Sequence, residues 1–344
     1  MEKNYLERYS RQLLFSQIGE KGQEKLAKSR VAIVGVGALG TVVANHLTRS
    51  GIGFIRLIDR DFVEKSNLQR QMLYDENDAL ENKPKAVAAF EKLKKINSSI
   101  EIEPVVTDIH AWNAEELLSD VDVIIDGTDN FLTRYIINDI SIKFNIPWVH
   151  GAAVRSRGMF AVFTPNQGPC YRCLFPDPPK GQSETCDLVG VISAVTHLVG
   201  SFEATEAIKL IVQDQKNRNP NLEQFDIWVN DEMKMDISKS KHPNCPACVH
   251  HEFEFLNAAF QGDEYAALCG RNAVQITPIK EQKIDLEKVK ENLLKVGTVE
   301  LNPFLLKCHL DRITLVLFNN GRVMIQGTDD ITKAKAIYAK YIGS

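Results

Sequence analysis

The sequence predicts an α/β protein: a Rossmann-like, mostly parallel sheet extended by antiparallel strands, followed by a small α+β domain. Three observations support this fold class. Apolar runs and helical segments alternate through about the first 150 residues, which is typical of βαβ units with right-handed crossovers. A G-x-G-x-x-G turn at Gly35–Gly40 joins the first predicted strand to a helix. After Arg157 this alternation gives way to an antiparallel pattern.

The parallel sheet can be predicted strand by strand. Val31–Val34 is apolar without polar alternation, as expected for a strand covered on both faces. Two short helices, at 5–15 and 23–27, are predicted before it. The same alternation then predicts strands at 31–35, 54–59, 101–106, 122–126 and 146–150, and helices at 39–50, 84–96, 113–118 and 131–144.

The second half of the chain predicts a change of architecture. MFAVFTP is an antiparallel strand, PDPPKGQSET is a segment expected to be mobile, and an apolar helix at 191–212 precedes a strand at 225–229. We place the domain boundary between residues 1–255 and 256–344. In the small domain, Asn319-Asn320-Gly321 indicates a hairpin turn. Its predicted strands are 273–277, 299–301, 304–310, 313–318 and 322–326, and its helices are 285–296 and 331–342.

Composition narrows the class of protein. The net charge of −4 gives no electrostatic reason to expect nucleic acid or an anionic membrane as a partner. No apolar run approaches the ~18 residues of a membrane span, and the polar N-terminus is unlike a secretory signal. We therefore expect a cytoplasmic protein, in which seven cysteines are not a disulfide framework.

The glycine-rich turn predicts a phosphate site. Gly35, Gly37 and Gly40 allow a tight turn and let the backbone approach a phosphate closely. The backbone amides of Ala38, Leu39 and the helix that begins there can donate hydrogen bonds to that phosphate. Asp59 follows the next strand at about the ~20-residue offset of a carboxylate that binds ribose. The glycine motif alone is equally compatible with a nicotinamide dehydrogenase.

The polar run from Asp59 to Gln71 favours ATP instead. A dehydrogenase has no evident need for it, whereas an enzyme that acts on ATP phosphates needs charge and hydrogen bonds there. Arg70 could neutralise charge during attack on the α-phosphate, and Asn67 could bind phosphate or ribose. Lys85 begins the next helix after Pro84. Asp61 and Gln71 complete the run as candidate nucleotide-binding residues.

Two further groups predict metal sites. DGTDN ends a strand, and of its carboxylates we prefer Asp129 for Mg²⁺, interpret Asp126 as a strand-end cap and keep Asn130 as a nucleotide-site residue. Two C-x-x-C pairs with 71 residues between them can supply a closed tetrahedral Zn²⁺ site. These ligands are Cys170, Cys173, Cys245 and Cys248.

Seven motifs in order make residues 5 to about 250 resemble the E1-like adenylyltransferases, of the ThiF or MoeB type. They are RYSRQ (8–12), GVGALG (35–40), D-x-D-x-V-x-x-S-N-L-x-R-Q (59–71), KPK (83–85), DGTDN (126–130), the paired C-x-x-C and TCDLVGV (185–191). The resemblance implies that MgATP adenylates the C-terminal Gly-Gly carboxylate of a ubiquitin-like sulfur-carrier protein and that pyrophosphate is released.

The same resemblance implies roles for individual residues. Asp59 would hold the ribose, and Arg70 and Lys85 the phosphates. Asp129 would bind Mg²⁺, the four cysteines would bind a structural Zn²⁺, and Arg11 would act as an arginine finger from the other subunit of a homodimer. No catalytic base is needed, because the attacking carboxylate is ionised at pH 7. Cys186 is a candidate for sulfur transfer to the carrier.

Several alternatives stay open. The carrier is of the ThiS type of thiamine synthesis or of the MoaD type of molybdopterin synthesis, and we lean to ThiS. The sulfur donor, for example a cysteine desulfurase, is not identified. Other classes are a tRNA-modifying dehydratase, against which the cysteines argue, and a non-catalytic nucleotide-binding scaffold, against which the retained charged residues argue. The C-terminal domain could dock the carrier, strengthen the dimer or bind another partner.

Overall fold

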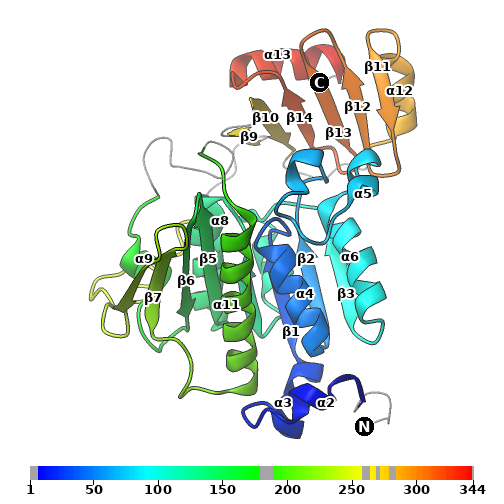
Figure 1. Cartoon of the computed structure of the whole chain (residues 1–344). Coiled ribbons are helices and arrows are strands. Elements are labelled where there is room, and N and C mark those ends of the chain that lie inside the picture. The colour runs from blue at the N-terminus through cyan, green and yellow to red at the C-terminus, as the bar shows by residue number, and fades with distance from the viewer. Residues whose placement is uncertain (1–6, 179–188, 258–263, 269–271, 279–283, 343–344) are drawn as a thin grey trace. The chain divides into compact units, whose positions relative to one another are not determined.

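The computed structural model describes residues 7–178, 189–257, 264–268, 272–278 and 284–342. These residues form two compact units, each described here by itself. The larger unit contains residues 7–178 and 190–257, and the smaller contains the described residues from 264 to 342. Figure 1 labels their helices and strands.

The larger unit is built on one eight-stranded sheet with the strand order β3-β2-β1-β4-β5-β6-β7-β8. The first five strands in this order are parallel, and the last three are added antiparallel, which confirms the predicted fold class. The strands are β1 (Arg30–Val34), β2 (Phe54–Ile58), β3 (Glu101–Val105), β4 (Val123–Asp126), β5 (Trp148–Val154), β6 (Arg157–Phe163), β7 (Asn221–Asp226) and β8 (Asp231–Asp236).

Helices cover both faces of the parallel part of this sheet. In β1, Val31 and Ile33 belong to one apolar cluster, whereas Ala32 and Val34 belong to another on the opposite face. Double burial is the reason that this strand shows no polar alternation. The helices are α2 (Ser10–Leu13), α3 (Gly19–Lys28), α4 (Gly40–Ser50), α5 (Glu76–Leu80), α6 (Lys85–Ile96), α7 (Ala114–Leu118), α8 (Phe131–Phe144), α9 (Tyr171–Leu174) and α11 (Ser193–Val212), with a 3-10 turn, η1 (Lys65–Asn67).

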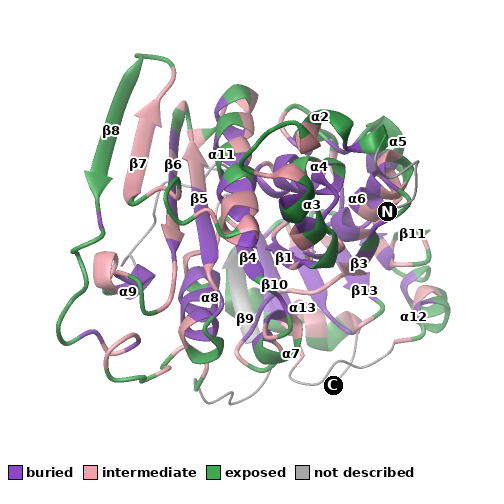
Figure 2. Cartoon of the chain, turned by 90° about the horizontal axis from the view of Figure 1, so that it is seen from below, coloured by how far each residue is buried: buried purple, intermediate pink, exposed green. Residues whose placement is uncertain are grey.

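One predicted strand in the larger unit is wrong. Residues 225–229 were expected to form a strand, but β7 ends at Asp226 and residues 227–230 turn into β8. Trp228 and Val229 are 76% and 65% exposed at this turn, so the apolar run is not buried by the sheet. Figure 2 shows the resulting gradient, from the buried strand β4 to the exposed edge strand β8. None of the helices in the described residues is long and apolar enough to cross a membrane.

The smaller unit is a six-stranded antiparallel sheet with the order β11-β12-β13-β14-β10-β9. Leu306, Leu317 and Ile325 belong to its apolar core, together with buried residues of both helices. The hairpin at 319–321 is confirmed between β13 and β14, where Gly321 adopts a φ of +89°. The elements are β9 (Glu264–Leu268), β10 (Ala273–Thr277), α12 (Leu286–Leu293), β11 (Thr298–Leu301), β12 (Leu305–His309), β13 (Thr314–Phe318), β14 (Val323–Gln326) and α13 (Ile331–Tyr341), of which β9 was not predicted.

Candidate active site

The strand order reverses between β1 and β4, and their two following loops adjoin. The backbone N–H of Gly127 donates to the Val34 carbonyl at 2.8 Å. A Cβ atom on Gly127 would lie 2.5 Å from the Gly35 carbonyl oxygen. The predicted glycine loop and the DGTDN loop are therefore packed together at the carboxyl ends of neighbouring strands, where ligands bind in open α/β sheets.

The three glycines of the first loop meet different requirements. Gly35 has a φ of +86°, in the left-handed region, and a Cβ on Gly40 would overlap the Gly35 carbonyl oxygen. A Cβ on Gly37 would instead find its nearest neighbour, Gln71 Nε2, only at 3.8 Å. Gly35 and Gly40 therefore serve packing, whereas Gly37 leaves open backbone that a phosphate can approach. Leu39 packs its side chain among Phe160 and Val199, so only its backbone could contact a nucleotide.

A carboxylate and a phenol clamp the backbone of Val36 by binding its N–H and its carbonyl. Asp59 Oδ2 accepts the Val36 N–H at 2.7 Å, and the Tyr74 hydroxyl donates to the Val36 carbonyl at 2.6 Å. Burial raises the pKa of Asp59, while the Lys85 ammonium opposes that rise. Sequence reasoning missed Tyr74, because nothing in the local pattern distinguishes it from a core aromatic residue. Its position makes it a support of the glycine loop.

Replacing Tyr74 by Phe is expected to raise the KM for ATP about five- to thirtyfold with little change in kcat. The lost hydrogen bond leaves a buried carbonyl without this donor, which costs about 1–2 kcal/mol. Steady-state exchange kinetics at varied ATP concentrations measure both constants, and isothermal titration measures the affinity for ATP. Tyr9→Phe is the matched control, because the buried Tyr9 hydroxyl instead accepts a hydrogen bond from Asn97 at 2.9 Å. Equal ATP affinities in the two variants would contradict the clamp.

Lys85 is held beside the same loop. It is 4% exposed, its Nζ lies 3.2 Å from Asp61 Oδ2, and its backbone N–H donates to the Asp61 carbonyl at 2.8 Å. A cation at a helix N-terminus is repelled by the positive end of the helix dipole. An anion at the same place interacts favourably with both the cation and the dipole. The Asp61 carboxylate supplies part of that negative charge, and a bound phosphate would add to it.

The remaining residues of the polar run lie on the segment that follows. The buried Asn67 side chain accepts the Glu64 N–H at 3.1 Å and so fixes the turn at η1. Arg70 Nη1 donates to the Ser66 carbonyl at 2.9 Å, and Gln71 is buried with its amide near Gly37. The structure thus brings Gln71 to the glycine loop, with Arg70 as its neighbour in the chain.

The two carboxylates of DGTDN have different environments. Asp126 is fully buried, and it accepts hydrogen bonds from Thr128 N–H at 3.0 Å, Arg134 Nε at 2.9 Å and His150 Nδ1 at 2.7 Å. This agrees with its interpretation as a strand-end cap. Asp129 is exposed on the same loop, so its carboxylate is accessible to a cation. Asn130 caps α8 by accepting the Leu132 N–H at 2.9 Å.

The four C-x-x-C sulfurs converge. All lie within 4.8 Å of one another, and three of their separations are 3.5, 3.6 and 3.8 Å. A tetrahedron with metal–sulfur bonds of about 2.3 Å has edges of about 3.8 Å. The cluster therefore has the donor set and the spacing to hold a metal ion. Cys186 and Cys269 lie outside the described residues.

Arg11 lies away from the other candidate residues of its own chain. In α2, Gln12 donates to the carbonyl of Ser50, the last residue of α4, and Tyr9 packs against Gly51. The glycine loop precedes the opposite end of α4, whose 11 residues span about 16 Å. Figure 1 shows α2 and α3 at the amino end of β1. Arg11 is thus not assembled into the site of the same chain.

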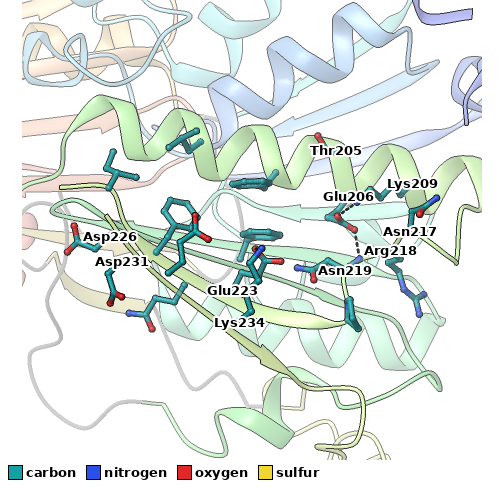
Figure 3. Close-up of a pocket in the computed structure, with 18 of the residues that line it drawn as sticks. Thr205, Glu206, Lys209, Asn217, Arg218, Asn219, Glu223, Asp226, Asp231 and Lys234 are labelled. Atoms are coloured by element: carbon teal, nitrogen blue, oxygen red, sulfur yellow. Dashed lines mark hydrogen bonds and ion pairs between the residues drawn. The ribbon is translucent and has the colours of Figure 1, made fainter. Parts of the chain in front are cut away.

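A pocket of about 910 Å³ lies elsewhere, between α11 and the β7–β8 extension (Figure 3). The Phe160 and Phe202 rings stack there at 4.6 Å, and Glu206 pairs with Lys209 at 2.6 Å. None of the predicted site residues lines it, and its five acidic and four basic side chains nearly balance. This pocket lacks the positive character that a triphosphate requires, so the glycine loop remains the candidate site.

Comparisons with known proteins agree with the motifs. A model of the ThiF family matches residues 9–247. The sulfur carrier protein ThiS adenylyltransferase of Bacillus subtilis is 43% identical over 337 residues, 98% of this chain and 99% of that protein. The SAMP-activating enzyme E1 of Haloferax volcanii is 36% identical over 249 residues, 72% and 90% of the two chains. Escherichia coli MccB, in its crystal structure with ATP, is 25% identical in sequence to this chain. The two structures match with a TM-score of 0.60 over 70% of this chain and 74% of the MccB chain. The chain therefore belongs to the ThiF family.

Proposed function

We propose that this protein uses ATP to adenylate the C-terminal Gly-Gly carboxylate of a ubiquitin-like sulfur-carrier protein of the ThiS type. A carboxylate oxygen attacks the α-phosphorus, the bond to the β-phosphate oxygen breaks, and pyrophosphate leaves. The supporting observation is the open backbone of Gly37 at the sheet edge where Lys85, Asp59 and the Asp129 loop meet. The full-length similarity to a ThiS adenylyltransferase favours this carrier.

Each residue has a physical role in this reaction. Amides of the glycine loop and the α4 N-terminus bind phosphate oxygens, and Asp59 accepts hydrogen bonds from the ribose. Lys85 and Arg70 stabilise the charge that develops in the transition state. Asp129 would hold Mg²⁺, which supplies charge neutralisation on the phosphates when bound. Catalysis then consists mainly of positioning and electrostatics.

ATP–pyrophosphate exchange with a ThiS-type carrier, a MoaD-type carrier and no carrier tests the proposal. Exchange with only the ThiS-type carrier is the expected result. Exchange with only the MoaD-type carrier would assign the enzyme to molybdopterin synthesis, and exchange with both would indicate a shared activator. If ATP binds but neither carrier supports exchange, the sulfur-carrier function is wrong and a scaffold or another carboxylate substrate replaces it.

We further propose that the cysteine cluster binds one Zn²⁺ and that the active form is a homodimer. The sulfur spacings support zinc, and one equivalent of zinc per chain by elemental analysis is the expected result. The position of Arg11 outside its own site supports a dimer that donates it. The cytoplasmic location, a cysteine desulfurase as the sulfur donor and the domain boundary between residues 1–255 and 256–344 remain predictions.

Replacing Cys186 by Ser is expected to leave carrier-dependent ATP–pyrophosphate exchange unchanged and to lower thiocarboxylate formation at least tenfold. The reason is that adenylation needs no thiol, whereas sulfur transfer through a covalent intermediate does. Mass spectrometry of the carrier after incubation with ATP and a sulfur donor measures the product. Cys308→Ser, in the core of the smaller unit, is the control. Unchanged thiocarboxylate formation in the Cys186 variant would remove this cysteine from the mechanism.

A further inference from the structure

The hairpin between β5 and β6 extends beyond the edge of the sheet at which the candidate nucleotide-binding residues lie. Asp126, the last residue of β4, pairs with His150 in β5, and β5 continues for four more residues to Val154. At about 3.3 Å per residue, the hairpin reaches about 13 Å past the end of β4. The predicted nucleotide-binding loops follow β1, β2 and β4, so the hairpin borders the site beside β4, on the side away from Asp59.

Arg155, in the turn of this hairpin, binds a distant segment through its backbone. Its φ is +56°, in the left-handed region that an arginine rarely adopts. Its N–H donates to the Gly190 carbonyl at 2.8 Å, and its carbonyl accepts the Ile192 N–H at 2.9 Å. These two bonds form a parallel β-bridge between Arg155 and Val191. Residues 190–192 are therefore held against the hairpin.

The opposite edge of this segment has an unused donor and an unused acceptor. In such a bridge, the residue between the two bonded positions directs its own N–H and carbonyl to the other side. Among the described residues, Val191 has no hydrogen-bond partner for its backbone N–H or for its carbonyl. Gly190 is exposed with a φ of +79°, and a Cβ atom there would find no atom of the described structure within 4 Å. Another chain can therefore approach this edge closely.

An extended peptide fits this edge. An accessible N–H and carbonyl at a strand edge pair with the backbone of an added strand, and main-chain hydrogen bonds then supply the affinity. In the proposed reaction, a C-terminal Gly-Gly carboxylate must reach the α-phosphorus while the folded body of its protein stays outside the site. About four extended residues span the length of the hairpin, and glycines allow the close backbone approach that such pairing requires.

We propose that residues 190–192 bind the C-terminal segment of the carrier protein as an added β-strand, with the N–H and carbonyl of Val191 as the hydrogen-bonding groups. This inference rests on the proposed function, in which that segment carries the reacting carboxylate. Arg155 holds residues 190–192 beside the hairpin through its two backbone bonds. Recognition of the carrier then depends on this backbone pairing, whereas ATP binds at the glycine loop without it.

Replacing Val191 by Pro tests the donor, because proline has no backbone N–H. We expect the KM for the carrier in ATP–pyrophosphate exchange to rise about five- to tenfold, with the KM for ATP unchanged. Isothermal titration with ATP verifies that the Val191→Pro protein is folded and binds the nucleotide. A wild-type KM for the carrier in a variant that binds ATP would overturn the inference. A rise in the KM for ATP alone would also overturn it, because this edge would then serve the nucleotide.

Semisynthetic carriers give a second measurement that leaves the enzyme unaltered. In each of them an ester replaces one amide of the C-terminal segment and so removes a single N–H. Because the Val191 carbonyl accepts one N–H, we expect one ester to weaken carrier binding about five- to tenfold and the others, which are the matched controls, to have little effect. Fluorescence anisotropy of labelled carriers with a non-hydrolysable ATP analogue measures these affinities. Equal affinities for all the esters would contradict strand pairing.

The same measurements separate this inference from the proposed function. Wild-type protein that binds the carrier but supports no exchange would refute adenylation, and the comparison of esters would still decide whether the carrier pairs with Val191. Wild-type protein that binds no carrier would overturn both.

Discussion

Replacing Asp129 by Asn is expected to lower carrier-dependent ATP–pyrophosphate exchange by about two to three orders of magnitude, the range seen when one transition-state charge contact is removed. The substitution keeps size and hydrogen bonding but removes the negative charge that would hold Mg²⁺ on the phosphates. Because Asp129 is exposed, the melting temperature should stay unchanged. Exchange rates at several Mg²⁺ concentrations and a thermal melt measure both effects.

Asp231→Asn provides the control for this loss. Asp231 is exposed on β8, far from the glycine loop in strand order, and the same chemical change there should leave exchange intact. If Asp129→Asn retains more than about a third of wild-type exchange at limiting Mg²⁺, this residue is not the cation ligand. Asp126→Asn would not serve this purpose, because Asp126 is the buried partner of Arg134 and His150.

Replacing Arg11 by Ala is expected to lower exchange by about 10²- to 10³-fold, because an arginine that meets developing phosphate charge contributes this much to catalysis. Within one chain Arg11 lies at the amino end of β1, so the loss would arise at the site of another subunit. Equal amounts of Arg11→Ala and Asp129→Asn chains should therefore restore activity when mixed. When the chains mix randomly, half of the dimers contain one chain of each variant. Each of these mixed dimers has one complete site out of two, so the expected activity is about a quarter of the wild-type activity.

Two controls separate this explanation from a loss of folding. Arg8→Ala, in the same segment, removes a hydrogen bond to the Ile96 carbonyl and should leave exchange unchanged. Native mass spectrometry verifies that mixed dimers form. Mixed dimers without recovered exchange would show that Arg11 does not act across the subunit boundary, and full activity of Arg11→Ala would remove it from the mechanism.

The fold of the larger unit could be predicted because its elements have strong local patterns. The apolar strand Val31–Val34, the glycines after it and the alternation to residue 154 specify parallel strands covered on both faces. The prediction of a strand at 225–229 was wrong because a local apolar pattern does not by itself ensure burial. An apolar run predicts burial, but β7 pairs with β8 across Asp226 and Asp231, so the run forms an exposed turn.

The candidate site was predicted where a residue carries its own chemical signal. Asp59, Lys85 and Asp129 follow strands or begin helices, and parallel strands bring such positions to one edge. Their individual roles remain predictions. Tyr74 and Arg134 carry no such signal. The Tyr74 hydroxyl donates to the carbonyl of Val36, 38 residues earlier in the chain, and the Arg134 guanidinium donates to the Asp126 carboxylate, eight residues earlier.

The sequence by itself determined the fold class, the family and the residue types for ATP chemistry, because periodicity, glycine spacing and dense polar motifs are local properties. Only the tertiary structure decided that the four sulfurs of the two C-x-x-C pairs lie within 4.8 Å of one another. It also decided that the Asp126 carboxylate is already hydrogen-bonded while Asp129 is exposed, and that Arg11 is far from the candidate site of its own chain. These facts depend on contacts between segments tens of residues apart. Packing of the whole domain sets such contacts, and no local pattern encodes them.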